Sequence, residues 1–446
     1  MKLVTLLAAL GTFAAPEVPV EQYRLDNGLT IVLSPDRDLP LVATEVLYLV
    51  GSGHEVQGRT GFAHLFEHLM FQGSQNFDKE YFQPFEPIGG NVNGTTNRDR
   101  TNYFERVPSN YLELPLWMES ERMENLLPAL DQKKLDNQRD VVKNERRQRY
   151  ENQPYGMAWW YLTEMLYPAG HPYRHEPIGS HEDLSAAKLE DVQHFFQKYY
   201  APANAVIAMA GDFDVNAVKP MIEKYFGGIP GGTRAATPQA VRPTLSGVQH
   251  RLVEDNIGLP RIYLAWHSPA LFEPGDAELD LFSSIASDGK SSRLFKALVY
   301  DQRVAKDVSA SQVSQKLGSL FVIQVTAAPG ETIDSVYRAL MPALSAALAR
   351  PPSDDELERA KNHYKKGFYE RIESVSSRAS TLASYYLYAG RADYFDEDLA
   401  RYVKATPSGV HEAARKSLDL SNLVRIDFVP RKPAAALGAK PGSSAR

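Results

Sequence analysis

One pattern occurs in both halves of the chain: a helix-like segment is followed by a strand-like run. Residues 191–200 read as a helix and precede the apolar run 204–210. Near the other end, the helix-like residues 409–418 precede the corresponding strand-like run 422–429. Each half also places its strands in runs and its helices in longer runs, which is typical of antiparallel sheets covered by helices. We therefore predict an α+β fold with two homologous domains.

A histidine–glutamate motif lies early in the first half. His64, Glu67 and His68 form the pattern H-x-x-E-H within residues 61–71, which read as a helix. On a helix these three side chains share one face. A solvated face is the simplest explanation, but the apolar flanking residues predict a buried helix, in which imidazole and carboxylate groups require partners. A zinc ion supplies them: His64 and His68 would bind it, and Glu67 would take a proton from a water molecule that zinc activates.

A second, charged helix offers a further ligand. A catalytic zinc ion usually has three protein ligands and one water molecule. Residues 135–149 read as a helix whose buried side is marked by Leu135, Val141 and Val142. Glu145 is the best candidate for the third ligand.

The motif and the distal helical glutamate together resemble those of the pitrilysin-like zinc peptidases, the family of insulin-degrading enzyme and the mitochondrial processing peptidase. The resemblance covers most of residues 20–430 and is to short subunits of the processing-peptidase type that carry the zinc motif. It implies one zinc ion per chain on His64, His68 and Glu145, with Glu67 as the general base. It also implies two related α+β domains and a closed chamber that admits peptides or unfolded segments.

Two departures from the family pattern bear on activity. Where the best-known members often have a second acidic residue ahead of the ligand glutamate, this chain has Gln138, which can form hydrogen bonds but cannot act as a base. Self-sufficient members also carry an Arg and a Tyr in the second half that stabilise the tetrahedral intermediate. Here these positions are Val299 and Lys306, while Tyr300 and Arg303 are out of register. Losing one such donor typically slows a reaction about a hundred- to a thousandfold.

The missing pair predicts the kind of assembly in which the chain works. We expect a zinc-dependent metalloendopeptidase subunit that forms a heterodimer with a homologous subunit supplying Arg and Tyr. A self-sufficient homodimer is one alternative. A catalytically silent scaffold subunit is another, although such subunits usually lose the motif, and a zinc-dependent hydrolase of non-peptide substrates stays open.

A polar, glycine-rich segment after the zinc motif is the candidate substrate-binding site. Residues 89–97 are poor material for a core, and residues 102–107 continue as a strand. An edge strand of this kind can pair its backbone with an extended peptide, and the resemblance implies that use for Asn93, Gly94 and Thr95. An ordinary glycine-rich hairpin is the alternative.

The two halves differ where the chemistry lies. The second half contains no H-x-x-E-H, and a gap-free comparison of residues 135–145 with residues 357–367 sets Glu145 opposite Gly367. It is therefore expected to be a non-catalytic wall. We predict a division into a signal peptide (1–15), a zinc-binding peptidase domain (16–226), a linker (227–250), a homologous non-catalytic domain (251–432) and a disordered tail (433–446).

Composition limits the partners and the compartment. The formal net charge is −6, without a long basic run, which argues against nucleic acid as a partner. Residues 2–15 combine one Lys with a mostly apolar run that ends in small residues, as a signal peptide does, and the run is too short to span a bilayer. We predict export, in a bacterium to the periplasm, with a buried N-terminal element of a cytosolic protein as the alternative. The sequence contains no Cys, so no disulfide is expected.

Overall fold

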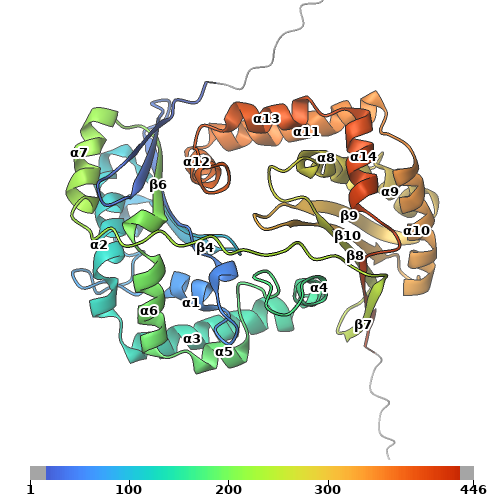
Figure 1. Cartoon of the computed structure of the whole chain (residues 1–446), viewed down its shortest axis with the longest axis horizontal. Helices are drawn as coiled ribbons and strands as arrows, with labels where there is room; N and C mark the ends of the chain where they lie inside the picture. Colours follow the sequence, from blue (N-terminus) through green and yellow to red (C-terminus); the bar gives the residue numbers. More distant parts are fainter. Residues whose placement is uncertain (1–16, 432–446) are drawn as a thin grey trace, which may run out of the picture.

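Two β-sheets, one in each half of the chain, form the framework of the protein (Figure 1). The structure is a computed structural model that describes residues 17–431, so the expected signal peptide and tail lie outside the described residues. The first sheet has the strand order β1-β2-β6-β3-β5-β4 and the second has the order β7-β11-β8-β10-β9. The strands are β1 (Glu21–Arg24), β2 (Thr30–Pro35), β3 (Leu41–Tyr48), β4 (Asn91–Thr96), β5 (Thr101–Pro108), β6 (Ala205–Gly211), β7 (Gln249–Asp255), β8 (Arg261–Ser268), β9 (Ala305–Val313), β10 (Ser319–Ala327) and β11 (Val424–Pro430).

The two sheets share one topology. Leaving β1 aside, the strands of each half lie in the order first, fifth, second, fourth, third. In both halves the first and fifth strands are parallel, and the other neighbouring strands are antiparallel. The predicted α+β class with two homologous domains is confirmed, but the sheets are mixed rather than purely antiparallel. The first and fifth strands can run parallel because the rest of the half forms the long connection between them.

Helices of each half cover one face of the sheet of that half. α1, α2, α3, α6 and α7 contribute to the core on the first sheet, and α8, α10 and α14 contribute to the core on the second. The helices are α1 (Phe62–Leu69), α2 (Glu113–Ala129), α3 (Gln132–Arg146), α4 (Ala158–Leu166), α5 (His181–Ala186), α6 (Leu189–Tyr199), α7 (Val215–Phe226), α8 (Asp276–Ser287), α9 (Arg293–Phe295), α10 (Ile333–Ala349), α11 (Asp354–Glu373), α12 (Val375–Ala389), α13 (Phe395–Val403) and α14 (Pro407–Ser417).

One expectation about α3 is wrong. Leu135 and Val142 are fully buried in the first core, as predicted, whereas Val141 is 42% exposed. Positions i and i+7 of a helix share a face, and here Leu135 and Val142 occupy the buried one. Val141 lies beside that face and points to solvent.

The second face of each sheet is covered by a helix from the opposite half (Figure 1). α12 of the second half lies on β3 and β6, where Leu382 shares a buried cluster with Leu47. α4 of the first half lies on β8 and β11, where Leu162 shares a buried cluster with Phe428. Residues 230–248, without helix or strand, join the halves and cross between them in Figure 1. The two halves therefore exchange helices as well as being tethered.

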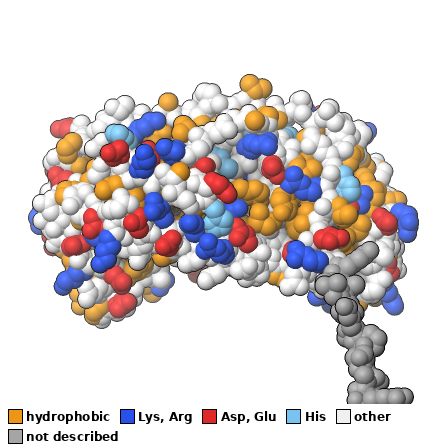
Figure 2. All heavy atoms as spheres, turned by 90° about the horizontal axis from the view of Figure 1, so that it is seen from below, with side chains coloured by type: hydrophobic (Ala, Val, Ile, Leu, Met, Phe, Trp, Pro, Cys, Tyr) orange, Lys and Arg blue, Asp and Glu red, His pale blue; other side chains and the backbone are white. Residues whose placement is uncertain are grey.

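The surface is mixed in character. Figure 2 shows acidic and basic side chains interspersed over the described part of the face that it presents, with hydrophobic side chains gathered towards its right. No helix in the described part of the chain combines the length and the hydrophobicity needed to cross a membrane.

Glu45 lies in the contact between the halves and makes folding stability depend on pH. Its carboxylate is 1% exposed and accepts hydrogen bonds from Asn102 Nδ2 (2.8 Å) and from Ser380 Oγ of α12. Burial raises the pKa of Glu45. Because the folded-state pKa lies above that of the unfolded chain, the contribution of this group to stability is complete at low pH and is lost as the pH rises through the folded-state pKa.

We therefore expect Glu45→Gln to become more stable, relative to the parent, as the pH rises from about 5 to about 8. A glutamine can keep both hydrogen bonds, because its carbonyl accepts from Asn102 and its amide donates to Ser380. Thermal unfolding at several pH values measures the difference, with the exposed Glu80→Gln as the control. A profile for Glu45→Gln that runs parallel to that of the parent would contradict the assignment.

Candidate active site

Three side chains predicted as metal ligands meet in the structure. α1 presents His64 and His68 on one face, with ring centres 4.8 Å apart, and α3 presents Glu145 towards them. Glu145 Oε2 lies 3.2 Å from His68 Nε2 and 3.8 Å from His64 Nε2. One donor atom from each residue lies within 4.8 Å of the others, and within residues 17–431 no other group of three His, Cys, Asp or Glu residues is arranged to hold a metal ion.

The chemistry of these donors fits a zinc ion. Two imidazole nitrogens and one carboxylate oxygen form a ligand set that zinc accepts. Burial, with the nearby His68 as a smaller cause, lowers the pKa of His64 to about 4, so its imidazole is neutral and free to bind a metal at neutral pH. Burial alone would raise the pKa of Glu145, but its hydrogen bond to His68 and the charges around it lower that pKa. The carboxylate is therefore ionised, as a ligand must be.

Two further polar groups hold the candidate ligands. His68 Nδ1 lies 3.3 Å from Gln138 Oε1, so Gln138 can fix the ring by accepting a hydrogen bond from it. Arg149 Nη1 lies 2.7 Å from Glu145 Oε1, the carboxylate oxygen that faces away from the histidines. This pairing leaves Oε2 directed at the two imidazoles.

Glu67 lies beside the three candidate ligands. Its side chain is 9% exposed, and Thr96 Oγ1 donates a hydrogen bond of 2.5 Å to Glu67 Oε2. Burial raises the pKa of Glu67, although the hydrogen bond from Thr96 acts in the opposite direction. A carboxylate with a raised pKa is a better proton acceptor at neutral pH.

The predicted substrate strand forms one wall of the same cavity. β4 is the last strand of the first sheet, and within residues 17–431 it pairs only with β5, so its other edge is open there. The cavity, of about 600 Å³, is lined by Asn93, Gly94 and Thr95 together with Glu67 and the three candidate ligands. A Cβ atom at Gly94 would lie 3.2 Å from Cγ of Glu67, so a glycine here lets β4 approach the carboxylate closely.

The first turn of α1 is held by residues that the sequence analysis did not single out. The side chain of Glu55 is fully buried, and it accepts hydrogen bonds from the backbone N–H of Gly61 (2.9 Å) and of Ala63 (2.7 Å). His175 Nε2 donates to the same carboxylate at 2.8 Å. A carboxylate shortly before a helix is a sequence signal that it binds the free N–H groups of the first turn. The contribution of His175 could not be inferred, since it comes from a distant loop.

The segment that should carry the Arg and Tyr pair lies elsewhere. Val299 packs partly buried against the second core, and Lys306 is exposed at the start of β9. Tyr300 is 70% exposed. Neither these three residues nor Arg303 lines the cavity that contains Glu67.

Comparison with known proteins assigns the family. Residues 31–169 match the family model described as Insulinase (Peptidase family M16), and residues 186–364 match the model described as Peptidase M16 inactive domain. The chain belongs to peptidase family M16. The resemblance to pitrilysin-like peptidases drawn from the sequence is thereby confirmed.

The names of individual M16 relatives also indicate peptidases. Zinc protease PqqE of Helicobacter pylori is 29% identical over 413 residues, which cover 91% of this chain and 89% of that protein. Mitochondrial-processing peptidase subunit beta of Blastocladiella emersonii is 23% identical over 385 residues, covering 84% of this chain and 81% of that protein. The crystal structure of a protease from Helicobacter pylori superposes with a TM-score of 0.86 at 26% identity, covering 93% of this chain and all of that one. The relatives named zinc proteases support metallopeptidase chemistry and imply zinc as the metal of this M16 chain.

Proposed function

We propose that this chain is the metal-bearing subunit of a zinc-dependent endopeptidase, with one zinc ion on His64, His68 and Glu145. The observation that carries the proposal is the convergence of their donor atoms within 4.8 Å, beside the buried Glu67 and the open edge of β4. The M16 family and the zinc protease names of its relatives support the same class of reaction.

Each residue around the site has a role in the proposed hydrolysis. A zinc ion bound here would supply Lewis-acid chemistry, polarising a carbonyl and acidifying water. Glu67 takes the proton of the attacking water and delivers it to the leaving amine. Thr96 holds one oxygen of Glu67 and so keeps the carboxylate in one orientation.

The open edge of β4 suits an extended peptide. Asn93, Gly94 and Thr95 present backbone groups along the cavity, and strand addition demands an extended chain while asking little of its sequence. The substrates proposed are therefore peptides or unfolded segments, hydrolysed in a closed chamber that excludes folded proteins.

The proposal includes a homologous partner subunit. Val299 and Lys306 occupy the positions of the family's Arg and Tyr, and neither lines the cavity. A partner would supply those groups as a heterodimer, and a homodimer is the alternative. The second half, most of which matches the inactive-domain model, serves as the non-catalytic wall. Export to a bacterial periplasm also stays a proposal, because residues 2–15 lie outside the described residues.

Removal of the metal is expected to abolish peptide hydrolysis, and added zinc is expected to restore it. Quenched-fluorescent unstructured peptides report hydrolysis by the chain, alone and together with a homologous Arg/Tyr-bearing subunit. The rate is measured before chelation, after chelation and after addition of one equivalent of zinc, and a stably folded protein is the control substrate. Activity that persists in metal-free protein would disprove the proposal. A zinc-loaded chain that cleaves only with a homologous Arg/Tyr-bearing subunit would support the heterodimer, and one inert with that subunit would indicate a scaffold.

A further inference from the structure

Asp99 is a buried carboxylate at which both halves of the chain meet. It lies in the turn between β4 and β5 and is 7% exposed. From the first half, Tyr173 Oη donates a hydrogen bond to Oδ1. From the second half, the backbone N–H of Lys316 and Tyr388 Oη each donate to Oδ2 at 3.2 Å. A carboxyl group that accepts hydrogen bonds from three donors forms a directional junction.

The second-half groups that bind Asp99 come from two distinct elements. Lys316 lies in the turn between β9 and β10, the hairpin that corresponds in sheet order to β4 and β5. Tyr388 lies near the end of α12, the helix that covers the first sheet. The backbone N–H of Leu317 also donates to Tyr173 Oη at 3.1 Å, so the second half holds the Tyr173 hydroxyl as well.

The junction is connected to the active site through a tight turn. Asn97 Oδ1 accepts hydrogen bonds from the backbone N–H of Asp99 (2.7 Å) and of Arg100 (2.9 Å). The carbonyl oxygen of Asn97 accepts a hydrogen bond from the N–H of Ser52 (3.0 Å). The carbonyl oxygen of Arg98 accepts one from the N–H of Gly53 (2.8 Å). Because these hydrogen bonds hold the turn in one conformation, the position of Asp99 also determines the position of β4, which ends directly before the turn.

The strand so held carries the groups that line the cavity. β4 ends at Thr96, whose hydroxyl holds Glu67, and its open edge is the proposed site of peptide pairing. An edge strand has a sheet neighbour on one side only, so its position depends strongly on what holds its ends.

We propose that Asp99 is a positioning residue through which the non-catalytic half sets the place of β4 for peptide binding. The inference rests on the proposed peptidase function. It gives the second half a task beyond enclosing a chamber: Lys316 and Tyr388 hold the turn from which the substrate strand extends.

Peptide binding tests this role without requiring hydrolysis. In a zinc-loaded chain carrying Glu67→Gln, the affinity for a fluorescein-labelled unstructured peptide is measured by anisotropy. Adding Asp99→Asn replaces an acceptor by an amide N–H that must face other donors, and we expect binding to weaken about tenfold. Tyr388→Phe removes only the hydroxyl from the second half, and we expect a loss of about threefold. In chains that retain Glu67, the same changes should raise KM and leave kcat per bound zinc within about twofold.

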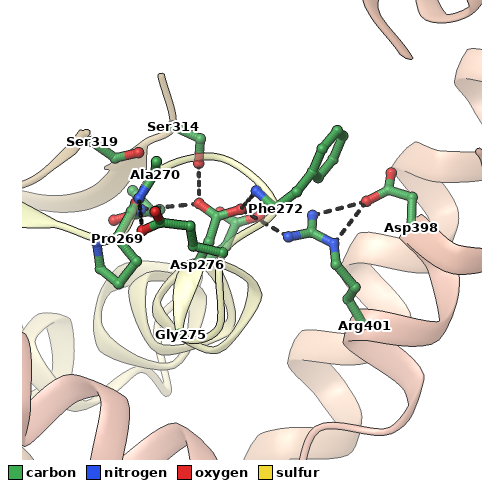
Figure 3. A network of polar contacts seen from close by, with 12 residues as sticks. Pro269, Ala270, Phe272, Gly275, Asp276, Ser314, Ser319, Asp398 and Arg401 are labelled. Atoms are coloured by element: carbon green, nitrogen blue, oxygen red, sulfur yellow. Dashed lines mark hydrogen bonds and ion pairs between the residues drawn. The ribbon is translucent and has the colours of Figure 1, made fainter. Parts of the chain in front are cut away.

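Asp398 offers a matched control. It is equally buried and accepts hydrogen bonds from Tyr385 Oη of the same helix α12 (2.8 Å), from Tyr364 Oη (2.9 Å) and from Arg401. Figure 3 shows it bound to Arg401, in a polar network of the second half. Asp398→Asn should lower the melting temperature as Asp99→Asn does and leave peptide affinity unchanged.

The outcomes separate this inference from the function on which it rests. Equal peptide affinity in the parent and in both the Asp99 and Tyr388 variants would overturn the inference and leave the proposed function intact. A KM that stays constant while kcat falls with the folded fraction would also overturn it, because this is the pattern of a purely structural role. A parent chain that neither binds nor cleaves peptides, alone or together with a homologous Arg/Tyr-bearing subunit, would overturn both.

Discussion

Glu67→Gln is expected to abolish peptide hydrolysis while the chain keeps its zinc. Glutamine has nearly the shape of glutamate, and its carbonyl can still accept the hydrogen bond from Thr96, but its amide cannot take a proton from water. Loss of a positioned general base typically lowers the rate about 10²- to 10⁴-fold. Because Glu67 is separate from the three proposed ligands, the metal site should survive. Initial rates on a quenched-fluorescent peptide and the zinc content of the same samples provide the measurement.

A second carboxylate in the first half supplies the control for this experiment. Glu86 is exposed and does not line the cavity of Glu67, so Glu86→Gln should keep both the rate and the zinc. A Glu67→Gln variant that hydrolyses at close to the parent rate would show that another group is the base. Loss of zinc from that variant would show instead that Glu67 is needed to form the site.

Arg122→Met is expected to destabilise the first half strongly. Arg122 is 1% exposed, and its guanidinium donates to Glu119 Oε2 (2.8 Å) and Glu105 Oε1 (3.3 Å). The rings of Tyr81 and Tyr103 lie over the same guanidinium, with centres 4.1 and 4.2 Å from its central carbon. Glu105 is also 1% exposed, and this burial raises its pKa. Methionine fills similar space and leaves two buried carboxylates without their cation.

Breaking a buried ion pair by removing one partner typically costs about 3–5 kcal/mol, and we expect a loss in this range for Arg122→Met. Urea unfolding monitored by circular dichroism measures it. Arg106→Met is the matched control, because Arg106 lies on the same strand as Glu105 and is exposed. If the loss arises from unpaired carboxylates, adding Glu119→Gln to Arg122→Met should recover part of it. A change below about 1 kcal/mol would mean that the carboxyl groups are neutral and need no cation.

Local sequence patterns predicted the parts of the site that lie on one helix. The spacing of His64 and His68 fixes their direction on α1, and their rings lie 4.8 Å apart in the structure. Glu145 was reached by combining a helical pattern with a family resemblance, since nothing local relates it to the motif. Thr96 and Glu55 were not singled out, because their hydrogen bonds to Glu67 and to the start of α1 form only after distant segments meet.

The fold shows the same division between local and distant information. The runs read from the sequence followed β6 and β11 closely. β6 is apolar on both faces, as a strand buried on both sides requires, whereas in β11 the buried Val424, Ile426 and Phe428 alternate with polar residues. The parallel pairing of β2 with β6 was not predicted, since strand direction depends on the path of the whole half. The exchange of α4 and α12 was also not foreseen, because an apolar face does not specify which helix covers it.

That exchange has a consequence for how the protein can be produced and divided. A fragment ending in residues 230–248 would keep α4 without the sheet that receives it, and its own sheet would lose the cover of α12. Each fragment alone would present a broad apolar surface and tend to aggregate. When the two fragments are synthesised together, each would supply the helix that covers the sheet of the other, without the covalent connection. The coding sequence could thus be divided within the codons of residues 230–248, provided that both fragments are synthesised in the same compartment at the same time.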